Sequence, residues 1–147
     1  WNFPINLTFA PLAGIFAAGN RTIIKPSEFT PVTSDLMARM FREAYDETEV
    51  AVVTGGPAVG EAFSHQPFDH LVFTGATSIA YHVMKAAAEN LVPLTLELGG
   101  KSPVIVSKSA KMDDAAAKIM TGKTMNAGQI CLAPDYVFVP EIGRAHV

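Results

Sequence analysis

A single cysteine, Cys131, lies in the stretch NAGQICLAP, between a Gly-Gln step and a Leu-Ala-Pro exit. A lone cysteine is most often a small apolar core residue, but as a thiolate it is also a strong nucleophile. A cysteine hydrolase would need a histidine partner, and His82 lies 49 residues upstream with no hydrolase signature around the cysteine. The sequence around Cys131 therefore argues against a hydrolase but leaves a core role and a catalytic role open.

The stretch FTGAT (73–77) could bind a phosphate group. It places a glycine and two hydroxyl side chains where a predicted strand is followed by a predicted helix. The amide groups at a helix N-terminus bind anions such as a pyrophosphate. The chain has no G-x-G-x-x-G fingerprint, however, and turns of the strand–glycine–helix type are common. From these residues alone, a tight turn and a phosphate site are equally good interpretations.

The elements that would position these residues are short β-branched runs alternating with stretches of helical spacing. The runs predict strands over 21–25, 49–55, 70–75, 93–100 and 102–107. Helices are predicted over 31–45, 77–90 and 113–125. Thr30 is the predicted N-cap of the first, before Pro31, and the acidic pair Asp113 and Asp114 suits the dipole of the third. This alternation predicts βαβ units, and therefore an α/β fold with a parallel sheet and flanking helices.

The composition describes a chain that can bury a core. Of its 147 residues, 49% are hydrophobic and 17% charged, which suits a single domain or part of one. A net charge of −3 gives no basic surface, so we expect no nucleic-acid partner. The longest apolar run, 9–19, contains Pro11 and is too short to span a membrane. With no signal-peptide pattern, no possible internal disulfide and no metal-site spacing, we expect a cytoplasmic protein without a metal.

Both ends of the chain look cut. The chain begins with WNFP and has no initiating methionine. At the other end, the strand-like stretch DYVFVP is followed by EIGRAHV (141–147), which contains no typical turn pattern. These seven residues match one reading frame of a common sequencing-library adapter. We therefore expect them to be a read-through tail outside the native protein. Seven matching codons at the genomic locus would contradict this expectation.

Taken together, five stretches resemble the aldehyde dehydrogenase superfamily in order and spacing. They are WNFP, AAGNRTIIKPSE, FTGAT, ELGGKSP and NAGQICLAPDY, and the resemblance covers residues 1 to 140. The wording AENLVPLTLELGGKSP and CLAPDYV is most similar to the coniferyl aldehyde dehydrogenase branch, close to the class-3-type enzymes. The resemblance implies a Rossmann-like fold, with residues 1–96 in an NAD-binding domain. Residues 97–140 would then begin the catalytic domain that carries the nucleophile.

The resemblance also assigns catalytic roles by position. Cys131 matches the nucleophile, Glu97 the general base and Asn2 the side-chain donor of the oxyanion hole. Taken singly, Glu97 would be an outward-facing strand residue and Asn2 a turn or cap residue. Their joint match with Cys131 is what favours the catalytic interpretation.

A second group of positions matches the cofactor site of the family. Lys25 and Glu28 match the pair that binds the adenosine ribose, and Trp1 matches a residue beside the cofactor. The turn under the pyrophosphate matches four residues: Gly75, Ala76, Thr77 and Ala80. Two of these depart from the usual pattern, because relatives often have serine at position 76 and glycine at position 80. The departures put the fine geometry of this turn in doubt, but not its mode of binding.

The implied function is oxidation of an aldehyde to a carboxylic acid through a cysteine thiohemiacetal and thioester. The cofactor would be NAD, with some tolerance of NADP, and the full-length protein a dimer or tetramer. Two alternatives within the superfamily are an acyl-CoA-forming or other reductase and a non-catalytic structural paralogue. The presence of Glu97 argues against the first, and that of both Glu97 and Cys131 against the second. The nicotinamide-ribose contact and most of the substrate tunnel would lie outside these residues, so we expect this chain alone to be inactive.

Overall fold

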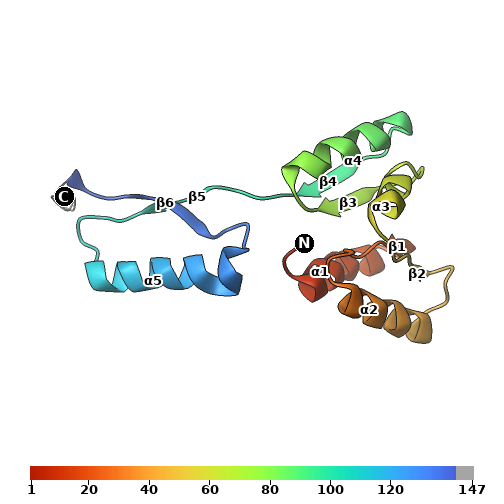
Figure 1. Ribbon diagram of the computed structural model, residues 1–147, viewed down its shortest axis with the longest axis horizontal. Coiled ribbons are helices and arrows are strands. Elements are labelled where there is room, and N and C mark those ends of the chain that lie inside the picture. Colours follow the sequence, from red (N-terminus) through yellow and green to blue (C-terminus); the bar gives the residue numbers. More distant parts are fainter. Residues whose placement is uncertain (142–147) are drawn as a thin grey trace. The chain divides into compact units, whose positions relative to one another are not determined.

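The computed structural model describes residues 1–141, and Figure 1 shows the order of its helices and strands. Except for Glu141, the expected read-through tail therefore lies outside the described residues. The chain divides after Glu97 into two compact units. The first unit comprises residues 1–97, the second begins at Leu98, and each is described by itself.

The first unit contains two βαβ motifs, as the alternation of patterns predicts. Strands β1 (Thr22–Ile24) and β2 (Val50–Val52) pair in parallel and are joined by α2 (Pro31–Ala44). Strands β3 (Leu71–Thr74) and β4 (Leu94–Glu97) pair in the same way around α4 (Thr77–Glu89). Parallel neighbours need a crossover connection, and a helix supplies it in both motifs. The strands are shorter than predicted but lie within the predicted ranges.

Two helices of the first unit were not expected from the sequence, α1 (Pro4–Ala17) and α3 (Pro57–Ser64). Proline occupies the start of each, where a helix tolerates it because the first amide has no partner within the helix. Pro11 lies inside α1, at a position where proline removes a backbone hydrogen bond. The helix continues beyond Pro11 because the side chains of the later residues Leu12, Ile15 and Phe16 pack in the core.

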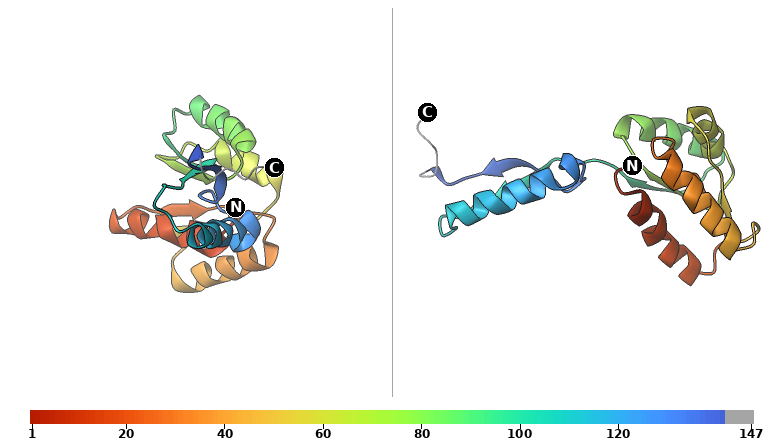
Figure 2. Two further views of the ribbon diagram at one scale, coloured as in Figure 1. Left: turned by 90° about the vertical axis from the view of Figure 1, so that its left-hand side faces the viewer. Right: turned by 60° about the horizontal axis from the view of Figure 1, so that its bottom comes forward.

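Two clusters of apolar side chains hold the first unit together. Leu12, Met37, Phe41 and Val50 form one cluster, between α1, α2 and the β1–β2 pair. In the other, Leu71 and Val92 meet Val83 and Ala87 of α4. Figure 2 shows α1 and α2 side by side, and the rings of Phe9 and Phe41 stack between them with centroids 5.4 Å apart. The core therefore fixes α2, which borders the candidate site.

The second unit is a third βαβ motif with a smaller core. Strands β5 (Ser102–Ile105) and β6 (Pro134–Phe138) pair in parallel, with α5 (Met112–Thr124) between them in sequence. A short 3-10 helix, η1 (Met125–Gly128), follows α5 and leads to Cys131. No residue of α5 is buried. This motif places the cysteine just before β6.

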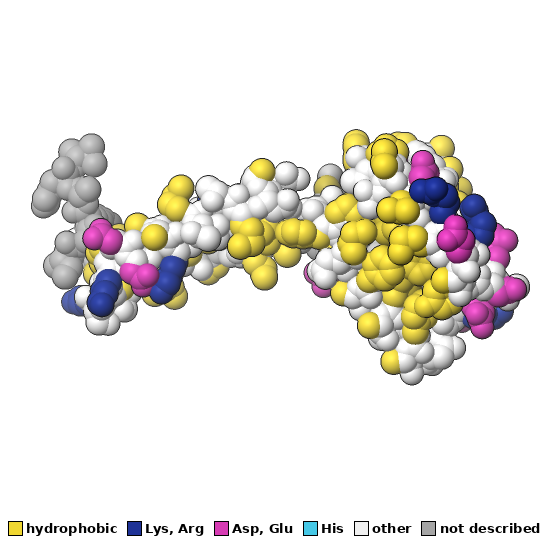
Figure 3. Space-filling view, turned by 90° about the horizontal axis from the view of Figure 1, so that it is seen from below, with side chains coloured by type: hydrophobic (Ala, Val, Ile, Leu, Met, Phe, Trp, Pro, Cys, Tyr) yellow, Lys and Arg dark blue, Asp and Glu magenta, His cyan; other side chains and the backbone are white. Residues whose placement is uncertain are grey.

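Large apolar side chains remain on the surface. On α1 and α2 they include Ile5, Val32, Leu36 and Met40, each at least 45% exposed. Figure 3 shows hydrophobic side chains gathered on one face of the first unit. Within residues 1–141, no helix combines the length and apolar character needed to cross a membrane.

Candidate active site

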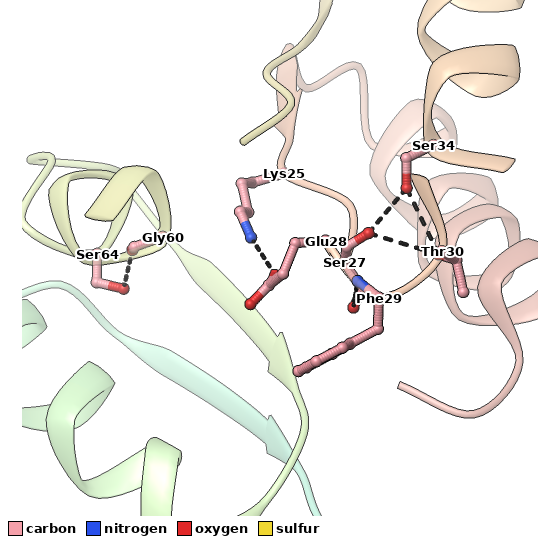
Figure 4. Close-up of polar contacts among 8 residues, drawn as sticks. All are labelled: Lys25, Ser27, Glu28, Phe29, Thr30, Ser34, Gly60 and Ser64. Carbon is pink, nitrogen blue, oxygen red and sulfur yellow. Dashed lines mark hydrogen bonds and ion pairs between the residues drawn. The ribbon is translucent and has the colours of Figure 1, made fainter. Parts of the chain in front are cut away.

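The turn that follows β1 carries an ion pair between Lys25 and Glu28. The ammonium Nζ of Lys25 donates to Oε2 of Glu28 at 2.9 Å (Figure 4). This hydrogen bond, followed by one from the backbone N–H of Glu28, lowers the pKa of the Glu28 carboxyl below its ordinary value. Glu28 is therefore ionised at neutral pH. Its side chain is 32% exposed, so water screens the pair and its contribution to folding stability is below about 1 kcal/mol.

A hollow of about 230 Å³ lies beside this pair, where the chain leaves β1 and β2. One wall comes from the turn and the start of α2, and the other from the residues after β2. The lining residues are Pro26, Ser27, Glu28, Pro31, Ser34, Asp35, Thr54 and Gly55. Gly55 has φ +155°, and a Cβ there would lie 2.5 Å from Cγ2 of Val59, so only glycine fits. Several of these lining residues carry hydroxyl or carboxylate groups, which are able to form hydrogen bonds with a sugar.

The FTGAT stretch forms the turn between β3 and α4, as predicted. Ala76 is the N-cap of α4, and no side chain forms a capping hydrogen bond there. An uncapped helix N-terminus directs its first amide groups outward, where they can bind a phosphate. Ala80 is 2% exposed and lies on the buried side of α4. The other helices of the described residues also lack a side-chain cap, so the phosphate site at this turn stays a prediction.

Glu97 is the last residue of β4 and is exposed. It pairs with Thr74 in the ladder, and its carbonyl accepts a hydrogen bond from the Gly75 amide at 3.1 Å. The candidate base and the pyrophosphate turn are therefore neighbours at one edge of the β3–β4 pair. Asn2 lies just before α1, whereas Trp1 packs against the core cluster at Leu12.

Cys131 lies in an exposed loop between η1 and β6. Three consecutive residues before it, Asn126, Ala127 and Gly128, have φ of 49°, 55° and 78°. The left-handed conformation costs a residue other than glycine about 1 to 2 kcal/mol, so this bend is strained at Ala127. Among the residues that the structure describes, the thiol of Cys131 is exposed, and the choice between a core role and a catalytic role stays a prediction.

Within the second unit, the residues that follow Glu97 in the sequence lie against the cysteine loop. A Cβ on Gly100 would stand 3.2 Å from the carbonyl oxygen of Cys131, so the two backbones are in close contact. Lys101 donates to Oδ1 of Asp135 at 3.0 Å, and Lys123 lies 3.9 Å from the same oxygen. These contacts join the ELGGKSP and NAGQICLAPDY stretches.

The structure thus brings some of the predicted site residues together. Lys25 meets Glu28, and Glu97 meets the turn at Gly75. Cys131 belongs to the second unit and Asn2 and Glu97 to the first, so their mutual approach stays a prediction. Among residues 1–141 no group of three or more histidine, cysteine or acidic residues could hold a metal ion.

Ser34, which lines the hollow, was not singled out in the sequence. Thr30 is the N-cap of α2 as predicted, but its side chain makes no capping hydrogen bond. Its hydroxyl lies instead 3.5 Å from both the carbonyl of Ser27 and the hydroxyl of Ser34. The only signal for Ser34 is a serine one turn after the cap.

Comparison with known proteins identifies the family of this chain. The model of the aldehyde dehydrogenase family matches residues 1–144. A probable coniferyl aldehyde dehydrogenase of Caulobacter vibrioides is 74% identical over 96% of this chain, and a coniferyl aldehyde dehydrogenase of a Pseudomonas species is 66% identical over the same share. The chain spans 29% of the length of each of these two relatives.

A solved structure of similar fold is the NAD+ complex of an aldehyde dehydrogenase from Bacillus cereus. It is 34% identical, with a TM-score of 0.87 over 97% of this chain and 30% of that one. The family match, the identities and the fold agree from the first residue to beyond the cysteine loop. The chain belongs to the aldehyde dehydrogenase family.

Proposed function

We propose that the full-length polypeptide carrying this chain oxidises an aldehyde to a carboxylic acid, with Cys131 as nucleophile and Glu97 as general base. The observation that carries the proposal is the packing of the Cys131 loop on Gly100, three residues after Glu97, in a chain of this family. The test is NADH formation by the full-length protein with a panel of aromatic and aliphatic aldehydes. No NADH with any of them would contradict the proposal.

Two domains share this work. Residues 1–96 would bind NAD and residues 97–140 would begin the catalytic domain. The division of the chain after Glu97 supports the boundary.

We further propose that the full-length protein is a homo-oligomer, a dimer or tetramer, and that it is located in the cytoplasm.

The first unit fits a dinucleotide. The ribose of its adenosine would bind at Lys25 and Glu28, beside the hollow, and its pyrophosphate at the uncapped N-terminus of α4. Glu28, being ionised, can accept hydrogen bonds from ribose hydroxyls. Backbone amides near Thr77 can hold the phosphates whatever side chain occupies position 76. When bound, the nicotinamide supplies the oxidation, because it accepts the hydride that leaves the substrate.

In the first half of the reaction, the thiolate of Cys131 adds to the aldehyde carbonyl and forms a thiohemiacetal. The carbonyl oxygen becomes an oxyanion that needs hydrogen-bond donors already in place. The side-chain amide of Asn2 and the backbone N–H of Cys131 would supply them. Loss of one such donor raises the barrier by about 3 kcal/mol.

In the second half, Glu97 removes a proton from water, which attacks the acyl group held on Cys131 as a thioester. The C–S bond breaks, the carboxylic acid leaves and the thiolate of Cys131 is restored. Gly100 lies against Cys131 and follows Glu97 by three residues, which span at most about 11 Å. Chain connectivity therefore supports a base close to the nucleophile.

For the substrate we propose an aromatic aldehyde such as coniferyl aldehyde. The support is the printed name of two relatives that are 74% and 66% identical to this chain. An acyl-CoA-forming reductase of the same family is the alternative. That enzyme would transfer the acyl group from Cys131 to coenzyme A and would not need Glu97 as a hydrolytic base. The reaction product distinguishes the two functions. A free carboxylic acid would support oxidation with hydrolysis, and an acyl-CoA would support the reductase.

The first prediction concerns the approach of the two catalytic groups. In a structure of the full-length protein, the thiol of Cys131 and the carboxylate of Glu97 should face one cavity about 5 to 8 Å apart, since one water must bridge them. The amide of Asn2 should point into the same cavity. Glu97 on the opposite face of the sheet would contradict the catalytic assignment.

A second prediction concerns the choice of cofactor. The charge of Glu28 should repel a 2′-phosphate, and Lys25 only softens that repulsion. We expect kcat/KM with NAD to exceed that with NADP about 5- to 30-fold, which corresponds to about 1 to 2 kcal/mol. Glu28→Gln should lower the ratio of kcat/KM with NAD to kcat/KM with NADP, because glutamine removes the charge and keeps the shape of the side chain. Equal or better kcat/KM with NADP in the unaltered protein would show that the electrostatic argument is wrong.

A further inference from the structure

Two groups tie the turn that carries Glu28 to the core, the fully buried side chain of Pro26 and the hydroxyl of Ser34. Ser34 is 4% exposed, and its Oγ donates a hydrogen bond to the carbonyl oxygen of Ser27 at 2.9 Å (Figure 4). The same carbonyl accepts only longer bonds from Thr30, 3.4 Å from its backbone N–H and 3.5 Å from its hydroxyl. The bond from Ser34 is thus the shortest hydrogen bond to this carbonyl.

The two ends of this bond differ in rigidity. Ser34 lies one turn before Met37, which is 1% exposed, and two turns before Phe41, on the same face of α2. Both are in the core cluster, so Ser34 is anchored. The turn lies outside any strand, and the ring of Phe29 is 88% exposed. Without the bond, Ser27 and Glu28 would be held by the buried Pro26 on one side and only by the longer bonds from Thr30 on the other.

We propose that Ser34 is a positioning residue for cofactor choice: its hydroxyl fixes the Ser27 carbonyl and thereby holds the neighbouring carboxylate of Glu28 at the edge of the hollow. The inference rests on the proposed use of NAD. A fixed Glu28 accepts hydrogen bonds from the ribose of NAD and repels the 2′-phosphate of NADP. A loosened turn weakens both effects, so affinity for NAD falls while affinity for NADP stays or rises.

The test compares two serine variants of the full-length protein. Ser34→Ala removes the bond to the turn. Ser64→Ala is the matched control, because Ser64 is 9% exposed and its hydroxyl donates to the Gly60 carbonyl at the same 2.9 Å within α3. Calorimetric titration with NAD and, separately, with NADP gives the two dissociation constants. Steady-state kinetics gives KM and kcat.

For Ser34→Ala, we expect the dissociation constant and KM of NAD to rise about three- to tenfold with kcat unchanged. The ratio of the NADP constant to the NAD constant should fall by at least the same factor, whereas Ser64→Ala should leave it unchanged. A purely structural role would lower the melting temperature of both variants without changing this ratio, and that result would overturn the inference. If the unaltered protein binds neither dinucleotide, the proposed function itself fails.

Discussion

Cys131→Ala should abolish aldehyde oxidation by the full-length protein, with a loss of at least about 10⁴-fold in kcat. Without the thiol no thiohemiacetal forms, so neither hydride transfer nor a thioester can follow. The measurement is NADH formation under saturating aldehyde and NAD, together with the intact mass of the protein after mixing. No acyl adduct should be found.

Two control measurements show whether this variant is intact: its melting temperature and its affinity for NAD. Alanine for cysteine removes only one small group, so the melting temperature should change little. The substitution leaves the Lys25–Glu28 ion pair unaltered, so NAD should bind as before. Residual turnover above one per cent would show that another group is the nucleophile.

The repeating pattern of the fold could be predicted from the sequence because each βαβ motif has a local signal. Helix α2 begins at Pro31 and α4 begins at Thr77, both as expected. Strand β4 ends at Glu97, within the predicted run 93–100. Proline at a first helical position and β-branched runs act within a few residues, so they need no tertiary information.

The two missed helices show where local signals fail. α1 contains Pro11, which by itself predicts a break, and α3 follows two glycines and is only eight residues long. The apolar side of α1 packs against Phe41 and Val50, which lie more than 20 residues away. This tertiary burial stabilises the helix, and a window of local sequence does not contain it.

The candidate site needed more than local pattern. Spacing alone left Cys131 between a core role and a catalytic one, and the proposed catalytic role rests on the family match. The roles of Glu97 and Asn2 rest on the family match, because a strand glutamate and a pre-helix asparagine are common. Ser34 carried almost no signal in the sequence, since its effect depends on a carbonyl seven residues earlier.

Glu97→Gln should separate the two halves of the reaction. Glutamine keeps the size and the hydrogen bonding of the side chain but cannot remove a proton from water, so the thioester on Cys131 should accumulate. We expect steady-state turnover to fall about 10²- to 10⁴-fold. Rapid mixing with aldehyde and NAD should still give a burst of NADH close to one per active site. Aldehyde oxidation up to the thioester does not use Glu97 as a base for water.

The height and rate of that burst identify a further role of Glu97. If Glu97 also removes the proton of the Cys131 thiol, the burst will be slower, but the acyl group will still be trapped and visible as added mass on Cys131. The alternative reductase predicts a different pattern, because added coenzyme A would restore turnover to the Glu97→Gln protein. Normal steady-state hydrolysis by this variant would contradict the role of Glu97 as the base that releases the product. Glutamine keeps the size of the side chain, so the melting temperature of Glu97→Gln should stay close to that of the unaltered protein and serves as the control for folding.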